Sequence, residues 1–257
     1  MKYLLFIILT ICTCSVVLAE NDIESAISFF EQGEYDKAKS IFNRDEFKQN
    51  ATALLYLGLI HDPEFNKIPF AKHIPAYDKK NDKATVMYYQ EAIQNGSAYA
   101  GYYLGRYFQT LSARRQQWKR GEKIWRKSLK PLKDLSEDGD WLAKYMLADI
   151  YSGKFKNKQY VDDALETLYK EARDGNTQAQ FYLGKSLSHW FICRTDECID
   201  YVRAYAWFGV SASQGSAHAF MYMSQIKKRL DEKEIIVGDK LLEEYFKKYR
   251  KPDEVSI

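Results

Sequence analysis

A short motif recurs along the sequence, and this repetition constrains the fold more than any other feature. In each copy a glycine is followed, four residues later, by an alanine. The four copies are Gly96 with Ala100, Gly139 with Ala143, Gly175 with Ala179, and Gly215 with Ala219. A degenerate fifth copy has Gln49 in the glycine position and Ala53 at the same offset. The copies are spaced 47, 43, 36 and 40 residues apart, a period that is typical of stacked helical repeats.

Each position of the motif has a physical reason. The glycine suits the left-handed backbone that ends many helices, because it has no Cβ to clash there. The next residue is a good N-cap for a following helix, and it is Asn50, Ser97, Asp140, Asn176 or Ser216. In the clearest copies the apolar residues follow at offsets 4, 7, 8 and 11 from the glycine, which is the spacing of one helix face. The sequence therefore predicts an all-α fold, an α-solenoid of helix-turn-helix repeats with a capping helix over 240–250.

The last copy carries a resemblance to a known family. Arg203-Ala-Tyr-Ala-Trp-Phe208 is followed by Ala212, Gln214, Gly215 and Ala219, and this pattern resembles the Sel-one-like repeat (SLR), a relative of the tetratricopeptide repeat. The resemblance implies a right-handed superhelix and a role as an adaptor or scaffold, often in an exported bacterial protein. The copy over 125–139 departs from the family pattern, because Pro131 stands inside its first helix and is expected to kink or divide it.

The chain divides into four parts. Residues 1–19 have a basic start, an uncharged stretch over 4–18 and a small residue at Ala19, the layout of a secretory signal peptide. Residues 20–48 look like a tetratricopeptide-type helical pair, 49–238 form the repeat array with an insertion over 61–81, and 239–257 form the capping helix and tail. We therefore expect a mature chain in the periplasm or secreted, beginning at Glu20. An uncleaved membrane anchor is the alternative.

Two cysteines, Cys193 and Cys198, follow the signal region. In an exported protein such a pair favours a disulfide that closes a small loop. A structural zinc site is a poor alternative, because two thiols do not complete a four-ligand shell. No metal and no cofactor are expected, since the four histidines are scattered without a paired spacing.

One motif favours an enzyme. Ser224-Gln-Ile-Lys227 fits the Ser-x-x-Lys of serine β-lactamases, and some exported SLR proteins carry β-lactamase-like names. The companion motifs of those enzymes are absent from the sequence, and Ser224 occupies the small-residue position of its repeat. We therefore predict a non-enzyme, with a β-lactam or peptidoglycan-directed hydrolase as the alternative.

A basic stretch over 114–133 forms the outer face of an expected amphipathic helix. Its first half carries Arg114, Arg115, Lys119, Arg120, Lys123, Arg126 and Lys127. It is either a solvated face or a contact for an anionic component of the cell envelope. Nucleic acid is not expected as a partner, because 38 basic residues nearly balance 35 acidic ones.

The positions that vary between repeats predict a binding surface. The third-column residues, three positions after the glycine, are Thr52, Tyr99, Leu142, Gln178 and His218. The sixth-column residues are Leu55, Tyr102, Tyr145, Phe181 and Met221, and the tenth-column residues are Leu59, Arg106, Asp149, Lys185 and Gln225. These three columns share a stripe that is expected to line the concave side of the array and to bind a protein or peptide partner. The candidate contact residues are Tyr99, Tyr102, Arg106, Tyr145, Asp149, Gln178, Lys185 and His218. The alternative is that the sixth column is part of the core.

Overall fold

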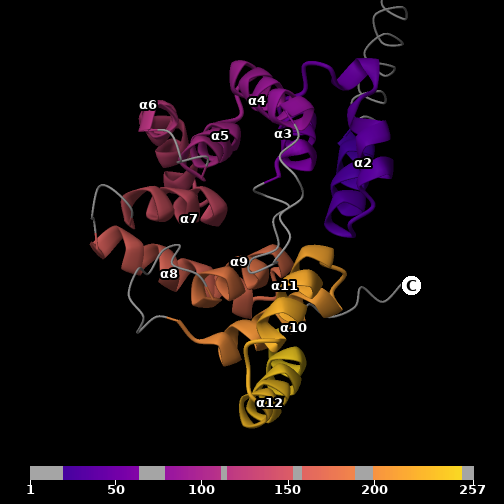
Figure 1. The fold of residues 1–257 in the computed structure, drawn as a ribbon, viewed down its shortest axis with the longest axis vertical. Helices are drawn as coiled ribbons and strands as arrows, with labels where there is room; N and C mark the ends of the chain where they lie inside the picture. Colours follow the sequence, from indigo (N-terminus) through magenta and orange to yellow (C-terminus); the bar gives the residue numbers. More distant parts are fainter. Residues whose placement is uncertain (1–19, 64–78, 111–114, 153–157, 189–198, 251–257) are drawn as a thin grey trace, which may run out of the picture.

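The computed structural model describes residues 20–63, 79–110, 115–152, 158–188 and 199–250, and all regular elements in these ranges are helical (Figure 1). The first is a helical segment over 20–31. It is followed by α2 (Tyr35–Phe42), a short 3-10 helix η1 (Asp45–Phe47), α3 (Ala51–His61), α4 (Lys79–Gln94), α5 (Ala98–Thr110), α6 (Arg115–Glu137) and α7 (Trp141–Ile150). The array ends with α8 (Lys158–Arg173), α9 (Thr177–Ser188), α10 (Tyr201–Ser213), α11 (Ala217–Lys227) and α12 (Glu232–Tyr249).

The glycine turns have the geometry that the sequence predicts. Gly96, Gly139, Gly175 and Gly215 have φ values between 91° and 96°. At Gly96 the glycine amide donates to the carbonyl of Ile93, and the amide of Ser97 donates to that of Ala92. This pair of bonds is the Schellman motif, which satisfies the last carbonyls of a helix. It explains why one helix ends and the next begins within three residues.

The predicted N-caps are confirmed in all five copies. The side-chain oxygen of each cap accepts a hydrogen bond from the backbone amide of the alanine three residues later. These bonds run from Ala53 to Asn50 at 2.9 Å, Ala100 to Ser97 at 3.2 Å, Ala143 to Asp140 at 2.7 Å, Ala179 to Asn176 at 3.0 Å and Ala219 to Ser216 at 3.2 Å. Because each bond satisfies an otherwise unpaired amide, the caps fix where the inner helices start.

The small residues of the motif let neighbouring helices approach closely. The five alanines at offset 4 are fully buried. At offset 9, a Cβ added to Gly58, Gly105 or Gly184 would lie within 2.7 Å of the ring of Tyr89, Trp125 or Phe208, respectively. Each of these rings belongs to the next helix along the chain, so in these three repeats the missing Cβ makes room for one aromatic side chain.

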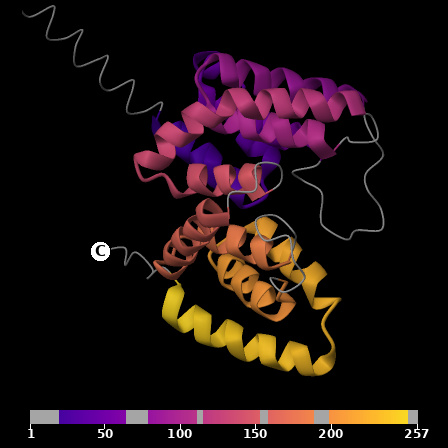
Figure 2. The ribbon, with the colours of Figure 1, turned by 90° about the vertical axis from the view of Figure 1, so that its left-hand side faces the viewer.

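From α2 to α11, each helix packs against the next one along the chain. At the C-terminal end of the array, α12 packs along α10 (Figure 2). We call α3, α5, α7, α9 and α11 the inner helices and α4, α6, α8, α10 and α12 the outer helices. The array curves so tightly that α2 meets α11 (Figure 1), where the Tyr35 hydroxyl and the His218 Nε2 lie 3.0 Å apart. The molecule is therefore a solenoid whose two ends touch.

Two boundaries differ from the sequence predictions. Pro131 was expected to kink or divide its helix, and the division does not occur, because α6 runs from Arg115 to Glu137 with the proline inside it. Pro131 is exposed, so water can bind the carbonyl that the missing amide leaves unpaired. The capping helix begins at Glu232 rather than at Lys240, because Asp231 and Glu234 form a capping box there.

Some predictions fall outside the described residues. The signal peptide over 1–19, both cysteines of the predicted disulfide (Cys193 and Cys198) and most of the insertion over 61–81 lie there. Among the described helices, none combines the length and the apolar character that crossing a bilayer requires.

Candidate functional site

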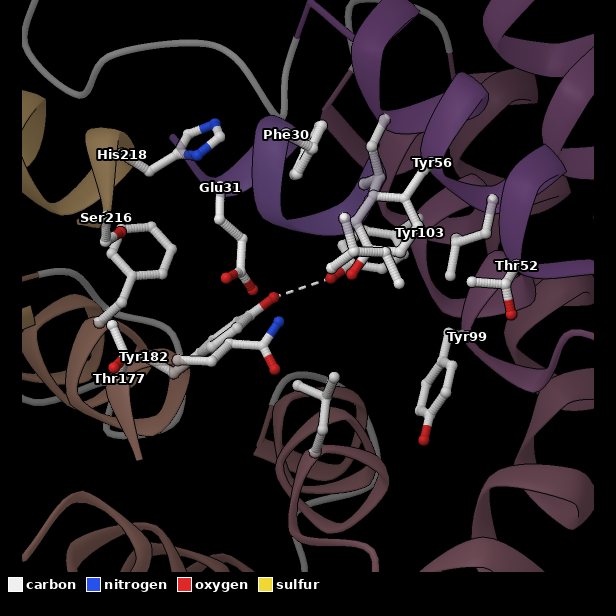
Figure 3. Close-up of a pocket in the computed structure, with 16 residues that line it drawn as sticks. Phe30, Glu31, Thr52, Tyr56, Tyr99, Tyr103, Thr177, Tyr182, Ser216 and His218 are labelled. Atoms are coloured by element: carbon white, nitrogen blue, oxygen red, sulfur yellow. Dashed lines mark hydrogen bonds between the residues drawn. The ribbon is translucent and has the colours of Figure 1, made fainter. Parts of the chain in front are cut away.

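The inner helices surround a cavity of about 220 Å³, which we call the inner cavity (Figure 3). All five third-column residues line it, one from each inner helix. The rest of its wall comes from the helical segment 20–31 and from neighbouring positions on the inner helices, including Ile27, Phe30, Glu31, Leu55, Tyr56, Leu59, Tyr103, Thr177, Phe181, Tyr182 and Ser216. One repeated position thus supplies one wall residue per repeat.

The meeting of the two ends of the array closes the inner cavity. His218 lies against Phe30, with 5.5 Å between the ring centroids, and against Phe181 at 6.1 Å. A Cβ added to Gly33 would lie 3.0 Å from that of Ala217. Without this contact the third-column residues would line an open groove, so the ring closure converts a groove into a pocket.

Aromatic side chains from several helices contribute to the wall of the inner cavity. Tyr103 and Tyr182 face each other across it and share a hydrogen bond of 2.7 Å between their hydroxyls, drawn in Figure 3. Glu31 directs its carboxylate toward Tyr182 in the same view, and partial burial raises the pKa of this carboxyl. Thr52, Tyr99, Leu142 and Gln178 each keep part of their surface exposed, so the cavity is reached from solvent.

The imidazole of His218 is neutral in this setting. Burial lowers its pKa to about 4, and the nearby positive charge of Lys185 lowers it further in the same direction. Since the ring has one donor and one acceptor nitrogen when neutral, it pairs with the Tyr35 hydroxyl without bringing a charge to the cavity.

The expectation that the sixth and tenth columns form an accessible stripe is wrong for several of the named residues. Tyr102, Tyr145 and Asp149 are 2%, 0% and 3% exposed. The Tyr102 hydroxyl donates to the Asp149 carboxylate at 2.8 Å, and the Arg106 guanidinium donates to the same oxygen at 2.8 Å. These side chains hold α5 against α7, because the tight curvature of the array turns the sixth column into core.

Lys185 also lies between helices rather than on an open surface. Its ammonium lies 5.4 Å and 5.1 Å from the ring centroids of Phe181 and Tyr182 on its own helix, and 6.0 Å from that of Tyr222 on α11. Burial, together with the charge of Arg106, lowers the pKa of this amine to about 7. Of the residues expected to contact a partner, Tyr99, Gln178 and His218 of the third column are the ones that line the inner cavity.

Two of these third-column residues also have structural partners. The Tyr99 hydroxyl donates to the carboxylate of Asp140, the N-cap of α7, and His218 pairs with Tyr35. For Gln178 and Thr52 no such bond is found within the described residues. These two are therefore the positions at which the cavity can be altered with the least effect on folding.

The basic face predicted on 114–133 lies on α6, an outer helix, with Lys119, Arg120, Lys123, Arg126 and Lys127 all exposed. Arg114 lies outside the described residues, and the side chain of Arg115, the first residue of α6, is not described either. Arg126 pairs with Glu122 at 2.9 Å. The face is on the opposite side of the repeat from the inner cavity.

The Ser-x-x-Lys motif has no catalytic geometry. The Ser224 hydroxyl donates to the carbonyl of Phe220 at 2.9 Å, within its own helix. The Lys227 ammonium lies 3.5 Å from the Tyr205 hydroxyl. No group of three histidine, cysteine, aspartate or glutamate side chains that could hold a metal occurs in the part of the chain that the structure describes.

Sequence reasoning missed the contribution of the N-terminal helix to the site. Ile27, Phe30 and Glu31 precede the first motif copy, and their position opposite α11 depends on the full turn of the superhelix. The only sequence signal for these three residues was that they share one face of an expected helix, and this does not show what that face contacts.

Comparison with known proteins gives few relatives. No family profile matches the sequence, and no curated protein matches it. A protective antigen present in uropathogenic Escherichia coli strains, which displays an SLR fold, is 20% identical, with 90% of this chain and 46% of that chain covered and a TM-score of 0.38. This chain therefore spans about half the length of that antigen. A Sel1 repeat protein from Oxalobacter formigenes is 17% identical, with 87% and 85% covered and a TM-score of 0.36.

The chain is similar to Sel1-repeat proteins. At these identities the likeness concerns the fold alone. The evidence for a helix-turn-helix repeat array in this chain is its own set of glycine turns, N-caps and close glycine–ring contacts.

Proposed function

We propose that this chain is an exported helical-repeat adaptor that binds a protein partner by taking a short segment of it into the inner cavity. The observation that carries the proposal is the contrast between columns of the repeat. The offset-4 position is alanine in every copy, because every repeat faces the same packing problem. The third-column position reads Thr, Tyr, Leu, Gln and His, and all five of these side chains meet around one cavity.

The size and chemistry of the cavity limit what it can hold. A volume of about 220 Å³ is below the roughly 300–1,000 Å³ of sites for drug-sized ligands. It suits one side chain or a chain end of the partner rather than a helix. Aromatic rings offer large contact areas with little loss of rotamer entropy, and Thr52, Gln178 and Ser216 offer hydrogen bonds.

Export is the part of the proposal that depends on the sequence alone. It is supported by the layout of residues 1–19, and it places the adaptor in the periplasm or outside the cell. A hydrolase is not favoured by any observation on the described residues, since Ser224 and Lys227 each have another partner.

A displayed peptide library tests the binding site. Peptides enriched on the protein should lose most of their affinity for Gln178→Trp, which fills the cavity from α9. They should bind Lys233→Trp normally, because Lys233 is exposed on the outer helix α12. Both variants should keep the wild-type helical spectrum and melting temperature. Peptides that bind all three proteins equally, or a library that yields none, would contradict the proposal.

A further inference from the structure

A second concave feature lies on the outer side of the array. The outer helices α4 and α6 both pack on α5, and between them runs a groove of about 620 Å³, which we call the outer groove. Gln90, Ile93 and Gln94 of α4 form one wall, and Arg120, Lys123 and Lys127 of α6 form the other. The inner cavity contributes no residue to it, so the two sites are separate.

The cationic wall is distinct from the rest of α6. In the second half of the helix, Lys130 pairs with Asp134 at 2.7 Å and Lys133 with Glu137 at 3.6 Å. Lys123 and Lys127 have no acidic partner among the described residues, and no acidic residue of the described chain lines the outer groove. The same helix therefore carries neutralised lysines at its C-terminal end and two lysines without a countercharge at the groove.

Arg120 completes the cationic wall. Residues 120, 123 and 127 follow the spacing i, i+3, i+7, which places them along one stripe of the helix. The Arg120 guanidinium lies 4.3 Å from the ring centroid of Phe108, which holds it beside the groove. Lysine supplies a point charge and arginine a planar fork, and both are common ligands of phosphate oxygens.

The groove also has an apolar lining, which Ile93 of α4 forms together with Leu104, Ile124 and Pro131. Ile93 keeps 38% of its surface exposed, and Met87 keeps 44%. Met87 lies outside the lining of the groove, so the apolar surface at the groove itself comes from Ile93, Leu104, Ile124 and Pro131. Exposed apolar groups beside a cluster of cations fit an amphiphile with an anionic end.

We propose that the outer groove binds the headgroup of an anionic phospholipid, with the phosphate between Arg120, Lys123 and Lys127 and the upper acyl region against Ile93. The apolar lining and the size of the groove favour a lipid over free phosphate. Charge complementarity favours an anionic headgroup, because the described lining offers three cations and no carboxylate. The site would hold the adaptor at a membrane surface while the inner cavity stays available to a partner.

Cosedimentation with vesicles tests the proposal. The full chain as purified from the cell should bind vesicles of phosphatidylcholine mixed with phosphatidylglycerol, and bind vesicles of phosphatidylcholine alone much more weakly. Each cation at an anionic surface contributes about fivefold to partitioning, so Lys123→Gln with Lys127→Gln should weaken binding about 25-fold. Lys123 and Lys127, and also Lys130 and Lys133 of the control variant described below, are exposed. The substitutions should therefore leave the fold unchanged.

The matched control is Lys130→Gln with Lys133→Gln, which removes the same charge from the same helix. It should weaken binding less than about twofold, because both lysines already face a carboxylate. Equal losses of vesicle binding in the two double variants would show a diffuse electrostatic attraction between the vesicle and the protein, and would overturn the proposal. Failure of the wild-type protein to bind anionic vesicles would overturn it as well.

A third variant separates lipid from free phosphate. Ile93→Ser should weaken vesicle binding several-fold, and inorganic phosphate should displace the vesicles only weakly. If Ile93→Ser bound the vesicles as well as the wild type, and phosphate displaced them efficiently, the groove would hold the phosphate group alone. That result would refute the proposal that its ligand is a phospholipid.

Discussion

Acid should open the contact between the two ends of the array, because His218 must gain a proton there. Its pKa is about 4 in the folded protein and about 6.5 in an unfolded chain. The unfolded state therefore binds more protons between these values. The stability that the neutral imidazole contributes is present above about pH 6.5 and is lost as the pH falls toward 4.

The magnitude follows from the same two values. Relative to neutral pH, proton linkage at His218 lowers the free energy of unfolding by about 2 kcal/mol at about pH 5 and by about 3 kcal/mol at about pH 4. His218→Phe keeps a ring against Phe30 and Phe181 but has no proton to gain. It loses the hydrogen bond to Tyr35, which costs about 1 kcal/mol at neutral pH, and its unfolding free energy should fall less than that of the wild type on acidification.

Urea unfolding followed by circular dichroism measures these differences at neutral pH and at about pH 5. Tyr35→Phe is the control, because it removes the same hydrogen bond but keeps the imidazole, so it should retain the wild-type pH dependence. Carboxylates elsewhere contribute equally to all three proteins and cancel in the comparison. If His218→Phe and the wild type lost the same free energy between the two pH values, the buried neutral imidazole would not be the acid-sensitive group.

Three further predictions concern packing, the buried ion pair and processing. Gly184→Ala brings a Cβ within 2.7 Å of the Phe208 ring and should lower the free energy of unfolding by about 1–3 kcal/mol, measured by thermal unfolding. Ser224→Ala, at the same repeat position, is the control and should change this free energy by less than about 0.5 kcal/mol. Arg106→Ala leaves the buried Asp149 carboxylate with only the Tyr102 hydroxyl and should cost about 3–5 kcal/mol in the same assay; a smaller loss would mean that water replaces the guanidinium. Intact-mass measurement of the protein from the envelope fraction should give a chain beginning at Glu20, and its two cysteines should react with an alkylating reagent only after reduction.

The helices and turns could be predicted from the sequence because they depend on local chemistry. A glycine with positive φ, as at Gly96, ends the helix in four copies, an acceptor side chain, as at Asn176, caps the next helix in all five, and a glycine at offset 9, as at Gly184, makes room for a ring in three. These positions contact residues of the same repeat or the next one, so a periodic sequence is enough to place them. The continuity of α6 through Pro131 was missed because it depends on solvent exposure of one carbonyl.

The site could be predicted only in part, because it depends on the curvature of the whole array. The third column was expected on the concave side, and its five residues do line one cavity. The burial of Tyr102 and Tyr145 agrees with the alternative that the sixth column belongs to the core, whereas the burial of Asp149 in the tenth column was not predicted. Small rotations at each repeat interface add up to the closure of α2 against α11, and no single motif encodes them.

Photocrosslinking in the producing cell tests the central claim most directly. A small aliphatic diazirine amino acid, close to glutamine in size, lies at the inner cavity without filling it when placed at position 178, and the same amino acid at position 233 lies on the outer helix α12. The account predicts a discrete crosslinked partner from position 178 that disappears when Thr52→Phe fills the cavity from the opposite wall, and none from position 233. A crosslink only from position 233, or one from position 178 that survives the filled cavity, would contradict it.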